Sequence, residues 1–162
     1  MHNRKRETPV RNPVVFFSVV AVGIVYGGLL AVNARVYGGV VPLTGVTVAF
    51  CAAIGGLIGC RANAGRKFVW GLPVGIAGIA IAVQITLFCV ATPRYTVADA
   101  EARLRAATPT AAISYFGAMD MQPSTAEWRG KGYVFTVTTD SGQADVVFHP
   151  DSGAYYALAH ES

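Results

Sequence analysis

Charged residues are scarce in this chain, and their scarcity excludes an ordinary soluble domain. Asp, Glu, Lys and Arg make up 14% of its 162 residues, whereas hydrophobic residues make up 53%. Soluble domains carry about 25% charged residues. We therefore expect much of the chain to be shielded from water by a lipid bilayer.

Cysteine is also rare, and its positions exclude a disulfide framework in the second half of the chain. Cys51, Cys60 and Cys89 all lie in apolar sequence. Their spacing matches no zinc or redox motif, and we interpret them as small hydrophobic packing residues. A nucleophile beside a base, a pair of acids or a cluster of metal ligands is equally missing at any usable spacing. The sequence therefore predicts no metal site, no cofactor and no enzymatic activity.

Acidic residues are nearly absent from the first 93 positions. That part holds eight Lys and Arg against one acid, Glu7, for a net charge of +7. Residues 94–162 hold five Lys and Arg against eight acids, for a net charge of −3. The overall positive charge is an average over two unlike halves, so it gives no support for nucleic-acid binding.

Three long uncharged runs separate the basic residues. They contain 23 residues after Arg11, 25 after Arg35 and 26 after Lys67. About 20 apolar residues in a helix suffice to cross the hydrocarbon core of a bilayer. The sequence predicts a basic N-terminus over 1–13, a three-helix membrane domain over 14–93 with spans at 14–32, 42–60 and 68–91, and a polar domain over 94–162.

The positions of the basic residues predict the orientation, because Lys and Arg accumulate in cytoplasmic loops. Seven flank the spans on the side of the N-terminus: Arg4, Lys5, Arg6, Arg11, Arg61, Arg66 and Lys67. Four lie on the other side: Arg35, Arg94, Arg103 and Arg105. We expect a multi-pass protein of the cell membrane with a cytoplasmic N-terminus and an extracytoplasmic C-terminal domain. Cleavage of the first span as a signal peptide after Ala34 is the alternative, and it leaves that C-terminal location unchanged.

Glycines four residues apart recur in the three spans. Such pairs let two helices approach closely in lipid, within the chain or with a partner protein. The pairs are Gly23 and Gly27, Gly55 and Gly59, and Gly71 and Gly75. Gln84 is the most polar residue expected inside a span, and its amide needs a partner in hydrocarbon. We interpret Gln84 as one side of an interhelical hydrogen bond, with a contact to a bound ligand as the alternative.

Helix and strand signals alternate in the C-terminal domain. Thr96 and Asp99 form a capping box at the start of a helix over 97–107. A further strand or short helix follows from Thr110, and three strands over 133–138, 144–148 and 154–158 are separated by turn sequences. The sequence predicts an α+β domain, one helix on an antiparallel meander with an open edge. Its expected core is Leu104, Tyr133, Phe135, Val137, Val146 and Phe148.

Two segments of this domain resemble the PepSY family of small extracytoplasmic domains. They are the strand Tyr-Val-Phe-Thr-Val at 133–137 and the strand and turn Val-Val-Phe-His-Pro-Asp-Ser-Gly at 146–153, after an Ala-rich and acidic helix. His149 departs from the family pattern, in which an acid is common. The resemblance implies a non-catalytic module that binds or restrains another protein. His149, Asp140, Asp145 and Asp151 are interpreted as solvated turn and strand-end residues, although His149, His160 and Asp151 would suit a metal if they met.

The preferred hypothesis is a non-enzymatic accessory or regulatory subunit of a membrane complex. Its expected partners are membrane lipids, other membrane protein subunits and an extracytoplasmic protein or peptide. A transporter or channel built from oligomerised helices and a membrane-tethered enzyme are the alternatives. Because the expected spans contain no Asp, Glu, Lys, Arg or His, transport by this chain alone is disfavoured.

Overall fold

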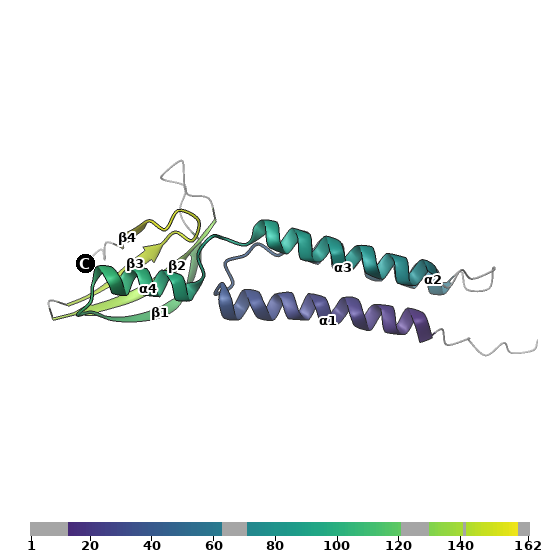
Figure 1. The fold of residues 1–162 in the computed structure, drawn as a ribbon, viewed down its shortest axis with the longest axis horizontal. Helices are drawn as coiled ribbons and strands as arrows, with labels where there is room; N and C mark the ends of the chain where they lie inside the picture. Colours follow the sequence, from purple (N-terminus) through teal and green to yellow (C-terminus); the bar gives the residue numbers. More distant parts are fainter. Residues whose placement is uncertain (1–12, 63–70, 121–129, 141, 159–162) are drawn as a thin grey trace, which may run out of the picture.

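The computed structural model describes residues 13–62, 71–120, 130–140 and 142–158. Three long helices lie side by side as a bundle, and a small α/β domain stands at one end of it (Figure 1). The helices are α1 (Pro13–Val36), α2 (Thr44–Ala62) and α3 (Gly71–Ala91), and each is long and apolar enough to cross a membrane. The three expected spans are confirmed as helices within the described residues, and positions 68–70 of the third lie outside them.

The first helix runs further than expected because its end is set by hydrogen bonding. The N–H groups of Tyr37 and Gly39 both donate to the carbonyl of Asn33, at 3.2 and 2.9 Å. Gly38 and Gly39 have positive φ angles of 56° and 81°, a conformation that ends helices and favours glycine. Pro42 follows in the connection, so the next helix begins only at Thr44.

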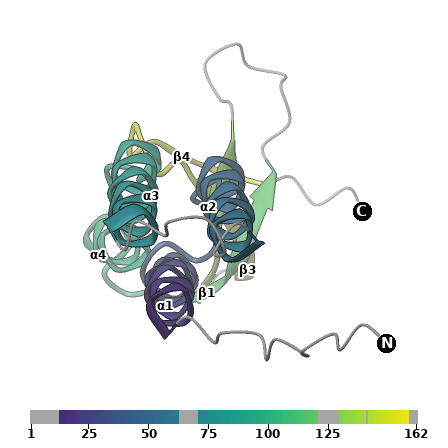
Figure 2. The same cartoon turned by 90° about the vertical axis from the view of Figure 1, so that its right-hand side faces the viewer.

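The bundle is closed by a seam of buried residues three or four positions apart. On α3 the seam is Pro73, Ala77, Ala80, Gln84 and Phe88. The three helices form a triangle when viewed along the bundle, which brings their seams together (Figure 2). One layer combines the small Ala53, Ala77 and Ala80 with Val22. Small side chains allow close approach of helices in lipid, where no hydrophobic effect drives them together.

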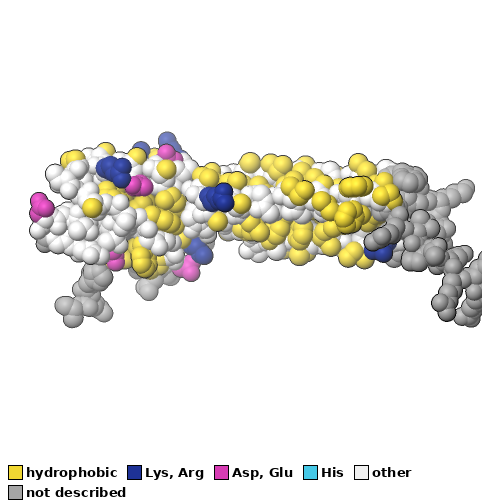
Figure 3. Space-filling model, turned by 90° about the horizontal axis from the view of Figure 1, so that it is seen from below, with side chains coloured by type: hydrophobic (Ala, Val, Ile, Leu, Met, Phe, Trp, Pro, Cys, Tyr) yellow, Lys and Arg dark blue, Asp and Glu magenta, His cyan; other side chains and the backbone are white. Residues whose placement is uncertain are grey.

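Large apolar side chains cover the outside of the bundle. Phe16, Phe17, Ile24, Ile79 and Val90 are each 65% or more exposed. Figure 3 shows this apolar band along the bundle, while charged side chains gather on the α/β domain and at the ends of the helices. A surface of this kind suits hydrocarbon and is unfavourable in water.

The α/β domain is a helix followed by an antiparallel four-stranded sheet. Its strands lie in the order β1-β2-β3-β4, so each pairs with the next in sequence. The expected α+β meander is confirmed, and the segment after Thr110 is a strand. The elements are α4 (Val97–Ala107), β1 (Ala112–Asp120), β2 (Lys131–Thr139), β3 (Gly142–Phe148) and β4 (Tyr155–Ala157).

The main core of the domain lies between α4 and one face of the sheet, called here the inner face. Leu104, Tyr133, Phe135 and Phe148 are buried there, as expected, and Val146 is half-buried. The opposite face of the sheet is more buried than expected for outward-pointing residues. Val134 and Val147 pair across β2 and β3 and are both buried, with Leu158 packed on them. The outward positions of these two strands therefore form a second small apolar cluster.

Candidate functional site

The six glycines expected to pack helices have room for a side chain among the described residues. A Cβ atom built on any of the three pairs meets no atom of the described residues within 4 Å. Gly45 and Gly56 lie closer to a neighbour, because a Cβ there would stand 3.5 Å from Leu87 and 3.6 Å from Ile76. Among the described residues the alanine seam supplies a buried layer of the bundle, and packing of the glycine pairs stays a prediction.

Gln84 is enclosed in the seam of α3, one turn from Ala80 and one turn from Phe88. It has no exposed surface, and neither its Oε1 nor its Nε2 has a hydrogen-bond partner among the described residues. Among the described residues, therefore, the amide does not make the interhelical hydrogen bond expected for it. A buried amide left in this state costs about 1–3 kcal/mol.

Two other polar contacts of the bundle are formed, and the sequence did not predict them. The hydroxyl groups of Tyr26 and Thr47 lie 3.0 Å apart and join α1 to α2. The side-chain amide of Asn33 donates to the carbonyl of Val41 at 3.2 Å and accepts from its N–H at 3.1 Å. This second pair fixes the connection between α1 and α2, because both backbone groups of Val41 are held.

That connection is built into the α/β domain. Val40 is buried in the core of the domain beside Leu104, Tyr133 and Phe135. The hydroxyl of Tyr115 on β1 donates to the carbonyl of Gly38 at 3.2 Å. Gly38 also permits the close approach, because a Cβ atom there would overlap the Tyr115 hydroxyl and stand 3.1 Å from Val97. Residues 38–40 therefore attach the bundle to the domain at a point distant in sequence from the covalent link.

The covalent link between α3 and α4 is also fixed to the domain by hydrogen bonds. The N–H of Tyr95 donates to the carbonyl of Pro150, and the carbonyl of Tyr95 accepts from the Tyr133 hydroxyl, each at 2.9 Å. The guanidinium of Arg103 stacks over the Tyr95 ring, 4.4 Å from its centroid. The two attachments together are called the junction, comprising Gly38, Val40, Tyr95, Tyr115 and Tyr133.

Burial keeps the two hydroxyl donors of the junction protonated. It raises the pKa of Tyr133 well above its ordinary value, with a further contribution from nearby Tyr115. Burial likewise raises the pKa of the Tyr115 hydroxyl. Because a neutral phenol donates a hydrogen bond and a phenolate does not, the junction persists through neutral pH.

His149 is not the solvated strand-end residue that was expected. Its side chain is buried, and Nδ1 accepts hydrogen bonds from the N–H groups of Asp151 and Ser152, at 3.3 and 3.0 Å. An acceptor that binds backbone N–H groups two and three residues ahead is the role that Asp or Asn plays in many turns. The imidazole therefore acts here as a turn acceptor in place of a carboxylate.

Two of the three aspartates expected to be turn and surface residues are solvated, and the third is not. Asp140 and Asp151 are exposed, whereas Asp145 is half-buried and accepts from the Thr136 hydroxyl at 2.9 Å. His160 lies outside the described residues. Within the described ranges, His, Cys, Asp and Glu form no group of three or more that would suit a metal ion.

The sheet has an open edge at β1. Only β2 pairs with β1 in the described part of the chain, so the other side of this nine-residue strand is available. The register with β2 shifts between Tyr115 and Gly117, and the intervening Phe116 is 82% exposed. A bulge with an exposed aromatic ring therefore stands on the open edge. Such an edge can accept an extended segment of another chain.

Comparisons of the chain with family models, with curated proteins and with solved structures find no match.

Proposed function

We propose that this protein is a non-enzymatic accessory or regulatory subunit of a membrane complex. The three helices cross the membrane with the N-terminus in the cytoplasm, and the α/β domain binds a protein or peptide outside. The apolar band around the bundle supports the membrane location. Seven Lys and Arg residues, which in sequence precede α1 or lie at 61–67, at the end of α2 and before α3, support the orientation.

The junction is the main observation in support of a regulatory role. A domain that served only as a tethered binding module would need one covalent link to its anchor. Here Val40, from the connection between α1 and α2, completes the core of the domain, and Tyr115 bonds to Gly38. A partner that shifts the sheet would thereby displace α1 and α2, which this connection joins, as well as α3. Coupling between two sites requires a physical connection of this kind.

The open edge of β1 is the proposed docking surface for the outer partner. Addition of a strand to a sheet edge gives affinity through main-chain hydrogen bonds and specificity through side-chain contacts. Phe116 supplies an exposed aromatic ring at the middle of this edge. Aromatic residues of this kind often dominate the binding free energy of an interface.

Site-specific crosslinking in intact cells tests this proposal. A photoreactive amino acid at position 116 should crosslink one defined protein, and Phe116→Ser should reduce its co-purification in mild detergent. The matched control places the same amino acid at Ala106, an exposed position of α4. Equal crosslinking from positions 116 and 106, or none from 116, would contradict the docking surface.

Cysteine labelling tests the orientation separately. After replacement of the native cysteines by alanine, an impermeant thiol reagent should label Asp140→Cys on intact cells and should not label Asn63→Cys. The reverse pattern would overturn the orientation, whatever the result of the crosslinking.

A further inference from the structure

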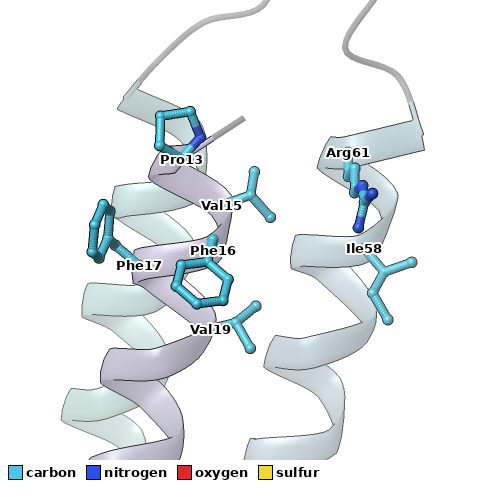
Figure 4. Close-up of a pocket in the computed structure, with 7 residues that line it drawn as sticks. All are labelled: Pro13, Val15, Phe16, Phe17, Val19, Ile58 and Arg61. Carbon is cyan, nitrogen blue, oxygen red and sulfur yellow. The ribbon is translucent and has the colours of Figure 1, made fainter. Parts of the chain in front are cut away.

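A groove opens between α1 and α2 at the end of the bundle far from the α/β domain. Its volume is about 580 Å³, and its walls include Val15, Phe16 and Val19 of α1 and Ile58 of α2. Figure 4 shows Val15 and Val19 pointing from α1 toward α2, with Arg61 on α2 above Ile58. The groove is thus apolar along its length and carries one cation at the end of the bundle.

The apolar walls of the groove are open to the surroundings of the bundle. Phe16 is 65% exposed and Ile58 is 60% exposed. At the proposed position in the membrane these side chains meet hydrocarbon, and an acyl chain can lie along them. Contact of this kind is non-directional and would accept any lipid tail.

Arg61 gives the groove a preference for a negatively charged ligand. It is exposed in the last turn of α2, and it forms no ion pair with any of the described residues. The guanidinium presents its N–H donors in a fixed fork that matches two oxygens of a phosphate. The adjoining α1 begins at Pro13, and the N-terminal end of a helix carries partial positive charge.

The sequence flanking this end of the bundle is also basic. Segments 1–12 and 63–70 contribute six further Lys and Arg residues against one acid, Glu7. Charge at this end is therefore complementary to an anionic membrane surface. Each Lys or Arg near such a surface strengthens binding about fivefold.

We propose that the groove between α1 and α2 is a binding site for an anionic phospholipid of the cytoplasmic leaflet. One acyl chain lies along Phe16, Val19 and Ile58, and the phosphate of the headgroup accepts hydrogen bonds from Arg61. This site rests on the proposed membrane location and orientation. It does not depend on the partner of the α/β domain.

Native mass spectrometry of the full chain in detergent tests the site. The probes are dioleoyl phosphatidylglycerol, which is anionic, and dioleoyl phosphatidylcholine, which is zwitterionic with the same acyl chains. The first phosphatidylglycerol should bind more tightly, by about fivefold or more. Arg61→Gln should lower that preference by about fivefold, Arg61→Lys should keep most of it, and Arg35→Gln at the opposite end should leave it intact.

A second variant tests the groove itself. Ile58→Trp narrows the groove at an exposed position, so the seam should stay packed and both lipids should bind more weakly. Equal affinity for the two lipids in the native chain would overturn the proposal. An unchanged preference in Arg61→Gln would also overturn it, because the charge would then act from elsewhere. The measurement needs no membrane orientation and no partner, so its failure is distinct from failure of the labelling or crosslinking experiments.

Discussion

At the scale of single residues, Gln84 is the least favourable group in the bundle. It lies where the seam of α3 otherwise carries alanine, proline and phenylalanine, and its amide atoms have no partner among the described residues. A polar group in hydrocarbon is retained at a cost in stability, which is often a sign of function. The sequence identified Gln84 as unusual, but burial without a partner becomes visible only in the packed structure.

Replacement of Gln84 by methionine should stabilise the bundle. Methionine has a similar length and flexibility and needs no hydrogen bond, so Gln84→Met should raise the free energy of unfolding by about 1 kcal/mol. Thermal unfolding of the full chain in detergent measures the change. Val22→Gln is the matched control, because it places the same amide at another fully buried seam position and should be destabilising. A clear loss of stability in Gln84→Met would show that the amide has a partner in the folded protein.

At the scale of elements, local patterns predicted the four helices and three of the four strands. The charge-free runs located three helices, and Thr96 with Asp99 located the start of α4 at the observed residue. The interior seam was not predicted. Residues such as Ala77 and Ala80 recur every three or four positions, as the glycines do, so spacing alone does not distinguish the two sets. His149 was expected to be solvated, and the structure shows it buried. Its burial depends on the turn at 150–153, where backbone N–H groups need an acceptor.

The capping box of α4 provides a test at this scale. The Asp99 N–H donates to Thr96 Oγ1 at 3.2 Å, and the Thr96 N–H donates to the Asp99 carboxylate at 3.0 Å. Thr96→Ala should lower the free energy of unfolding by about 1 kcal/mol, as loss of an N-cap usually does. Thr110→Ala, at an exposed turn position, is the control and should have little effect.

The capping box also predicts how the stability of the domain depends on pH. Hydrogen bonds from the backbone and side chain of Thr96 lower the pKa of Asp99 below its ordinary value of 3.8. The stabilising effect is therefore complete above that value and is lost as the pH falls through the lower, folded-state pKa. An NMR titration of the Asp99 carboxyl group should show this lowered pKa in the native chain and a value closer to the ordinary one in Thr96→Ala.

At the scale of the whole molecule, the junction joins the bundle and the α/β domain into one body. Val40, which completes the core of the domain, and Gly38, which bonds to Tyr115, lie more than 50 residues before that domain, and no periodic pattern marks them. The sequence placed the domain boundary at 94, and that prediction did not include the loop that completes the core. Contacts of this range follow from the three-dimensional arrangement and not from local preference.

Because Val40 lies outside it, the segment 94–162 lacks part of its own core. A domain of this size without disulfides has little stability to spare. The rigid coupling proposed for the subunit depends on the same residue, so replacement of Val40 should loosen the attachment of the domain to the helices.

The most direct measurement of that coupling is the distance distribution between two spin labels. With the native cysteines replaced by alanine, labels at the exposed Ile79 of α3 and Gln143 of β3 report on the bundle and the domain. Pulsed electron paramagnetic resonance of the full chain in nanodiscs should give one narrow distribution. Val40→Ser should broaden it, and Val36→Ser, at an exposed position four residues earlier, should leave it narrow. A broad distribution in the chain that retains Val40, or no change in Val40→Ser, would contradict the account.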